Sequence, residues 1–196
     1  MAAKGVFCLE GLWQADLRKA STVQPILAFL KQNAGIPYIY RDCATQEEFK
    51  FYLSKFPQVQ YRDYPILYLA FHGEPGRILI SGKTSLDLED IGALLGNQCK
   101  GRLVIIGSCS VLDINKRILK SFLKATGAFA VCGYRNDVDW MRSTAFELLL
   151  LTELQENTFD GRGVRSIVAK CDSLRRRFAD SDRHKDISFR IVSIAD

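Results

Sequence analysis

Short, continuously apolar segments alternate along this chain with longer segments of helical periodicity, and this alternation constrains the fold more than any other feature. Strands that are apolar at every position are typical of parallel sheets covered by helices on both faces. The clearest ones span residues 65–71 and 102–107. Further strands are expected at residues 5–9, 38–40, 77–81, 128–132 and 187–194. Helices are expected at residues 24–32, 45–56, 85–95, 115–125, 143–154 and 166–178.

This order of elements predicts an α/β protein. We expect a three-layer α/β/α sandwich whose central, mostly parallel sheet has about six strands. The 196 residues fit one domain, spanning residues 1–196. With 47% apolar and 25% charged residues the chain has the composition of a globular protein.

Several classes of function are disfavoured by composition and spacing. No apolar run approaches the roughly 20 residues of a membrane span, and Glu10 follows the first residues too closely for a signal peptide, so we expect a cytoplasmic protein without a membrane partner. The net charge is only +5, and acidic residues interrupt the basic segment at residues 170–185, so no nucleic-acid partner is expected.

Metal and nucleotide sites are disfavoured as well. The six cysteines form no C-x-x-C pair and there are only two histidines, so we expect no metal. The Gly82-Lys83-Thr84 run lacks the first glycine of a phosphate-binding loop, because Arg77 stands at that position. The sequence therefore predicts no cofactor.

Reactive side chains follow directly after the predicted strands. Ligands of open α/β sheets bind at the carboxyl ends of the strands, which here lead into Glu10, His72, Cys109 and Arg135. His72 and Cys109 end two strands that can lie side by side, which favours a Cys/His dyad. Gly73 and the turn at Cys109 offer backbone N–H groups for an oxyanion. The alternative is a buried structural thiol beside an ordinary turn histidine.

An ordered set of short motifs makes this interpretation more specific. The runs FHGEPG, SLDLEDIGALL and GRLVIIGSCS, followed by GYRN, resemble the core of the caspase-type cysteine peptidases and their simpler CHAT-like relatives. The resemblance covers roughly residues 62–152. It implies that Cys109 is the nucleophile, that His72 is the acid/base, and that the N–H groups of Gly73 and Cys109 form the oxyanion hole.

Substrate preference is less well defined by the resemblance. Caspases place Gln and Ala directly before the nucleophile, where this chain has Gly107 and Ser108, so strict aspartate specificity is not implied. Arg135 matches the arginine of the caspase pocket and would bind an acidic group. Glu10 stands where relatives specific for Arg or Lys place an acid. Both models stay open.

The function expected from these residues is that of a cysteine endopeptidase. Its expected partner is a polypeptide substrate. A second expected partner, if the enzyme is made as an inactive precursor, is a protein that activates it. The alternative is a catalytically inactive caspase-like module that binds or signals. A small-molecule hydrolase or a nucleotide-binding domain would need a further pocket, for which the sequence offers no motif.

Overall fold

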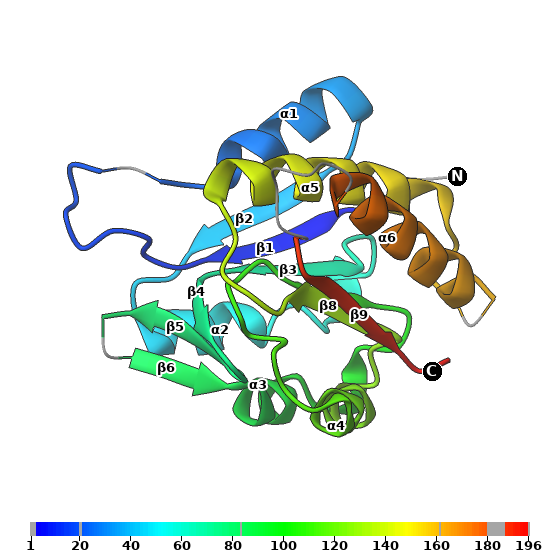
Figure 1. Ribbon diagram of the computed structural model, residues 1–196. Coiled ribbons are helices and arrows are strands. Elements are labelled where there is room, and N and C mark those ends of the chain that lie inside the picture. Colours follow the sequence, from blue (N-terminus) through cyan, green and yellow to red (C-terminus); the bar gives the residue numbers. More distant parts are fainter. Residues whose placement is uncertain (1–2, 20, 83, 161, 180–186, 196) are drawn as a thin grey trace.

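A six-stranded sheet lies between two layers of helices in the computed structural model of the chain (Figure 1). The structure describes residues 3–19, 21–82, 84–160, 162–179 and 187–195. Five strands are parallel, and the last is antiparallel to its neighbour. Across the sheet the strands follow the order β2 (Tyr38–Asp42), β1 (Val6–Glu10), β3 (Ile66–Ala70), β7 (Leu103–Ile106), β8 (Ala130–Tyr134) and β9 (Phe189–Ser193). The expected three-layer α/β fold is confirmed.

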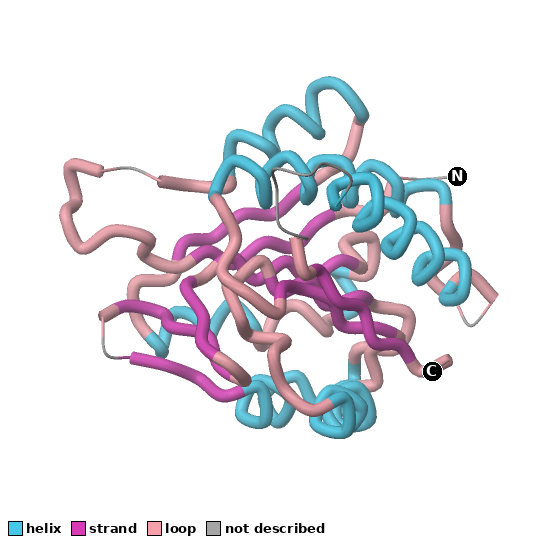
Figure 2. The backbone as a smooth tube through the Cα atoms, in the orientation of Figure 1, coloured by secondary structure: helices cyan, strands magenta, loops and turns pink. Residues whose placement is uncertain are grey.

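The helices divide evenly between the two faces of the sheet (Figures 1 and 2). One face is covered by α2 (Gln46–Leu53), α3 (Leu88–Leu95) and α4 (Lys116–Thr126). The other face is covered by α1 (Gln24–Ala34), α5 (Trp140–Glu153) and α6 (Val164–Ala179). Short 3-10 turns lie at Val59–Tyr61, Gly96–Gln98 and Leu154–Glu156. No helix in the described part of the chain has the length and apolar character needed to cross a membrane.

The inner strands β3, β7 and β8 are buried at every position because each face of the sheet has its own core. In β3, Leu67 and Leu69 pack with the cluster under α2, α3 and α4. Ile66, Tyr68 and Ala70 point the other way, into the cluster under α1, α5 and α6. Full burial of a large apolar side chain stabilises a fold by about 1.5–3 kcal/mol, so β3 anchors both layers.

A second, smaller sheet lies beside the main one. It is an antiparallel sheet of β4 (His72–Glu74), β5 (Arg77–Ser81) and β6 (Thr84–Asp87). The prediction that a helix begins at residue 85 is wrong, because Leu86 pairs with Ile78 and is buried, so the helix starts only at Leu88. Pairing with β5 has overridden the local capping signal.

Helix boundaries elsewhere follow local chemistry. Thr45 and Glu48 form the predicted capping box of α2, and α4 ends at Gly127, whose φ of 74° is left-handed. Helix α5 starts at Trp140, earlier than the expected residue 143, because the side chain of Asp139 accepts a hydrogen bond from the N–H of Arg142.

The register of the parallel strands brings their carboxyl ends to one edge of the sheet. Glu10 is paired with Ala70, and Leu69 is paired with Ile106. Ile106 is in turn paired with Gly133. The segments that follow β1, β3, β7 and β8 therefore emerge together, as predicted, and these segments contain the candidate site residues.

Candidate active site

His72 begins β4, two residues beyond the end of β3. Its Nε2 lies 2.7 Å from the backbone carbonyl oxygen of Trp13, in the segment that follows β1. A carbonyl only accepts hydrogen bonds, so this contact requires a proton on Nε2. In the neutral ring Nδ1 is then unprotonated and free to take up a proton. The Trp13 ring also meets the imidazole edge to face, with centroids 5.1 Å apart.

Cys109 lies in the turn that follows β7 and is partly exposed. Its backbone N–H has no hydrogen-bond partner among the described residues. The next residue, Ser110, has a φ of 59°, in the left-handed region that non-glycine residues rarely adopt. Its hydroxyl donates to Asp137 (2.9 Å) and its N–H to the carbonyl of Asn136 (3.2 Å). The loop after β8 therefore holds the Cys109 turn in shape.

Gly73 is the point at which β4 packs against the Cys109 turn. A Cβ atom built on Gly73 would lie 2.3 Å from Cγ2 of Val111, 2.6 Å from the carbonyl oxygen of Cys109 and 3.0 Å from Cβ of Ser108. These separations are shorter than van der Waals contact. Only a glycine lets the segment carrying His72 approach the segment carrying Cys109 this closely.

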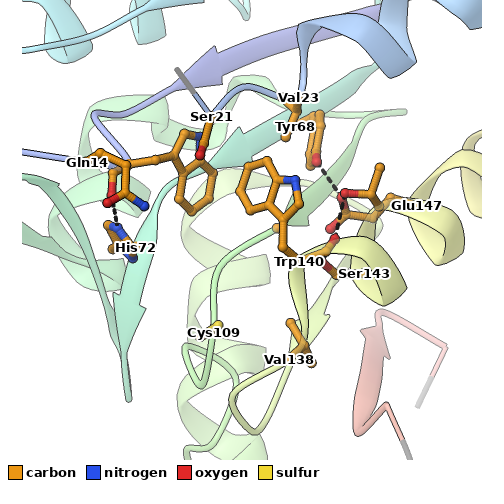
Figure 3. Close-up of a pocket in the computed structure, with 13 residues that line it drawn as sticks. Gln14, Ser21, Val23, Tyr68, His72, Cys109, Val138, Trp140, Ser143 and Glu147 are labelled. Atoms are coloured by element: carbon orange, nitrogen blue, oxygen red, sulfur yellow. Dashed lines mark hydrogen bonds between the residues drawn. The ribbon is translucent and has the colours of Figure 1, made fainter. Parts of the chain in front are cut away.

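One pocket is lined by both His72 and Cys109 (Figure 3). Its volume is about 160 Å³. Rings of Trp13 and Trp140 line it and meet edge to face, with centroids 4.7 Å apart. Tyr68, Gly107 and Glu147 also line it. His72 and Cys109, which follow two neighbouring strands, thus line one cavity.

Glu10 is buried and does not line this pocket. Its carboxylate accepts hydrogen bonds from the indole Nε1 of Trp13, from the Thr22 hydroxyl (2.7 Å), from the Val23 N–H (2.8 Å) and from the Tyr40 hydroxyl (2.6 Å). Burial and the bond to Glu10 raise the pKa of Tyr40. Glu10 thereby fixes Trp13, whose carbonyl in turn contacts His72.

Arg135 follows β8 and also lies outside the pocket. Its side chain is 55% exposed and forms an ion pair with Asp113, with Nη2 3.4 Å from Oδ1. It lines a separate hollow of about 580 Å³ together with Arg175 and Arg190. The structure therefore brings together His72, Gly73 and Cys109, whereas Arg135 and Glu10 lie beside them.

Glu147 and Trp13 are site residues that the sequence reasoning did not single out. Glu147 is buried in α5, and its carboxylate accepts hydrogen bonds from the hydroxyls of Tyr68 and Tyr134. Burial raises its pKa to about 7, and the two hydroxyl donors oppose that rise. The sequence contains a feature that could have identified Glu147, because it is the one charged residue in the apolar run from Phe146 to Leu151.

The other thiols differ from Cys109 in burial. All six cysteines are free, and only Cys109 is not buried. Burial raises the pKa of Cys43 and Cys171 to about 12 and that of Cys99 to about 11. It also raises the pKa of Cys8 and Cys132 well above the usual value. Five thiols are thus kept protonated and out of reach of reagents.

The Gly82-Lys83-Thr84 run and the basic segment at residues 170–185 are described only in part. Lys83, of the Gly-Lys-Thr run, and the basic residues 183–185 lie outside the described residues. On α6, Lys170 forms ion pairs with Glu153 and Glu156, as expected for a solvated helix face. In the described ranges no three His, Cys, Asp or Glu side chains gather in a way that would hold a metal ion.

Comparison with known proteins adds a family and a fold. A family model described as "Family of unknown function (DUF6642)" matches residues 3–176. No curated protein matches the chain. The crystal structure of caspase-1 from Spodoptera frugiperda is similar with a TM-score of 0.60 and 15% sequence identity, over 98% of this chain and 87% of that chain. At this identity the likeness shows the fold, and it confirms the caspase-like fold that the motifs indicated.

Proposed function

We propose that this chain, which belongs to the family of unknown function (DUF6642) and has a caspase-like fold, is a cysteine endopeptidase with Cys109 as nucleophile and His72 as acid/base. The observation that carries the proposal is that both side chains line one pocket while the Trp13 carbonyl holds Nε2 of His72. A thiol needs a neighbouring base to react at neutral pH, and a base needs a partner that fixes its tautomer.

The first half of the reaction forms a thioester. Nδ1 of His72 takes the proton of the Cys109 thiol, and Sγ attacks the carbonyl carbon of the scissile peptide bond. The carbonyl π electrons move to the oxygen, which accepts hydrogen bonds from the N–H groups of Cys109 and Gly73. The C–N bond then breaks, and the leaving amine takes the proton from His72.

The second half returns the enzyme to its starting state. His72 removes a proton from water, and the resulting hydroxide adds to the thioester carbon. The C–S bond breaks, the carboxylic acid product leaves, and the proton held by His72 returns to the Cys109 sulfur. The N–H of Cys109 has no partner among the described residues, which supports this mechanism, because an oxyanion donor must be available to the substrate.

Glu10 and Arg135 stay predictions as substrate contacts. Arg135 would have to exchange Asp113 for a substrate carboxylate, which its exposure allows. Glu10 would have to give up four donors to bind a basic side chain. Single substitution of each by Ala tests both models, and an unchanged cleavage preference in both variants would exclude them.

A mixture of fluorogenic peptides tests the activity itself. We expect cleavage by the wild-type chain and by Cys43→Ala, a variant of a buried thiol, and no cleavage by Cys109→Ala with an unchanged unfolding temperature. Cleavage by Cys109→Ala at the wild-type rate would overturn the proposal. A folded wild-type chain that cleaves nothing, with or without an activating protein, would favour the inactive binding module.

A further inference from the structure

Glu147 is a buried carboxylate. The residue is 4% exposed, and no Lys or Arg of the described ranges forms an ion pair with it. Its hydrogen-bond donors are two neutral tyrosine hydroxyls, Tyr68 and Tyr134 (3.0 Å). Buried carboxylates are normally paired with a cation or hydrogen-bonded several times, as Glu10 is with its four donors.

This carboxylate belongs to the same pocket as the thiol and the imidazole. Glu147, His72 and Cys109 all line it, and Figure 3 shows Glu147 on the far side of Trp140 from His72. A Cβ atom built on Gly107, two residues before Cys109, would lie 3.0 Å from Oε1 of Glu147. The Glu147 carboxylate therefore lies close to the backbone of Gly107, which leads directly into the turn that contains Cys109.

The walls of the pocket between Cys109 and Glu147 suit an aliphatic chain that ends in a cation. Trp13, Val23, Val138 and Trp140 line the pocket, so its sides are largely aromatic and aliphatic. Methylene groups pack favourably on such walls, and indole faces attract cations. The carboxylate supplies the negative charge that the head group of such a chain requires.

Charge argues against an acidic ligand in this pocket. Arg135, the residue that would pair with a carboxylate, lines a different hollow and is already paired with Asp113. A substrate carboxylate in the pocket would meet Glu147 and be repelled, or would require it to be protonated. A substrate cation would instead favour the ionised form of Glu147, which burial alone disfavours.

We infer that the pocket takes the side chain of a lysine or arginine immediately before the scissile bond, with Glu147 as its counter-charge. This inference rests on the proposed peptidase function for its position in the substrate. It assigns to Glu147 the role that the sequence suggested for Glu10, whereas Glu10 holds Trp13. The hydroxyls of Tyr68 and Tyr134 hold the carboxylate in place.

Matched covalent probes test the preference at the thiol. Peptidyl acyloxymethyl ketones with Lys, norleucine or Asp at the reactive position differ in charge, and norleucine keeps the carbon chain of Lys without its ammonium group. We expect the Lys probe to label Cys109 about tenfold or more faster than the norleucine probe, because only the Lys probe can form a charge-assisted contact with Glu147. Glu147→Gln should abolish this preference, so that within this variant the Lys and norleucine probes label Cys109 at similar rates. Faster labelling by the Asp probe, or a Lys preference that survives Glu147→Gln, would overturn the inference.

A binding measurement separates this inference from the peptidase proposal. Calorimetric titration of Cys109→Ala with peptide amides ending in Lys or norleucine requires no reaction at sulfur. One outcome is that the Lys peptide binds more tightly than the norleucine peptide, that Glu147→Gln removes this preference, and that no probe labels Cys109. This outcome would support the pocket assignment and refute the peptidase proposal. Labelling at equal rates by all probes would support the peptidase and refute the pocket assignment.

A second variant guards against misfolding of Glu147→Gln. Tyr134→Phe removes one donor to the carboxylate and keeps the ring. Loss of that donor raises the pKa of Glu147 further, so the Lys preference should appear only at higher pH than in the wild-type chain. An unchanged pH dependence of the preference in Tyr134→Phe would count against Glu147 as the counter-charge.

Discussion

Gly73→Ala tests most sharply whether the His72 strand and the Cys109 turn are packed as one unit. The added methyl group would lie 2.3 Å from Val111 and 2.6 Å from the carbonyl oxygen of Cys109. The second of these neighbours is backbone, so no side-chain rotation relieves the clash. The turn or β4 must move, and both contain proposed catalytic residues.

The size of the effect follows from overpacking in a closed site. Insertion of a methyl group into well-packed surroundings destabilises a fold by about 1–3 kcal/mol. For a chain of this size each kcal/mol lowers the unfolding temperature by about 2–4 °C. We therefore expect a decrease of roughly 2–12 °C, measured by circular dichroism. Alkylation of Cys109 should slow toward the rate in His72→Ala, because the thiol and the ring are displaced from each other.

Gly92→Ala is the matched control. A Cβ atom there meets Phe122 at 3.4 Å, which is ordinary contact, and Ala is the better residue inside helix α3. This variant should be as stable as the wild-type chain or more stable by about 0.5–1 kcal/mol. Wild-type stability and wild-type Cys109 reactivity in Gly73→Ala would refute the packing described here.

Two further substitutions probe the buried carboxylates. Glu10→Ala leaves the Val23 N–H and the Tyr40 hydroxyl without the carboxylate that accepts their hydrogen bonds. Urea unfolding should therefore show that the free energy of unfolding falls by at least about 2 kcal/mol. A free energy of unfolding equal to that of the wild type would contradict the role of Glu10 as an anchor. Glu147 has a folded-state pKa of about 7 against the usual 4.5, so the folded state binds the proton more tightly and its stability falls as pH rises through this window. Relative to Glu147→Gln, the free energy of unfolding of the wild-type chain should fall by about 2–3 kcal/mol between pH 5 and pH 8. If the difference in unfolding free energy between the two chains does not vary with pH, the carboxyl group of Glu147 is not buried as described.

Most of the sheet was predictable from the sequence because its signals are local. A strand buried on both faces, such as β3, is apolar throughout, and the capping box of Thr45 and Glu48 marks the start of a helix. That His72 and Cys109 line one pocket is consistent with topology, since carboxyl ends of neighbouring parallel strands share an edge.

The features that the sequence did not predict depend on contacts between separate elements and loops. Strand β6 exists because Leu86 pairs with Ile78, which no local pattern announces. Trp13 lies in a loop without periodicity, and its position depends on the buried carboxylate of Glu10. The orientation of Arg135 depends on Asp113, which lies in a different loop.

The central claim is that His72 activates Cys109, and alkylation of each cysteine measures this directly. Wild-type chain and His72→Ala are treated with iodoacetamide from pH 6 to pH 9, and modification at each of the six thiols is followed by mass spectrometry. The account predicts that Cys109 reacts faster than the five buried thiols near neutral pH and slows in His72→Ala. A Cys109 that reacts no faster than the buried thiols, or at the same rate without His72, would contradict it.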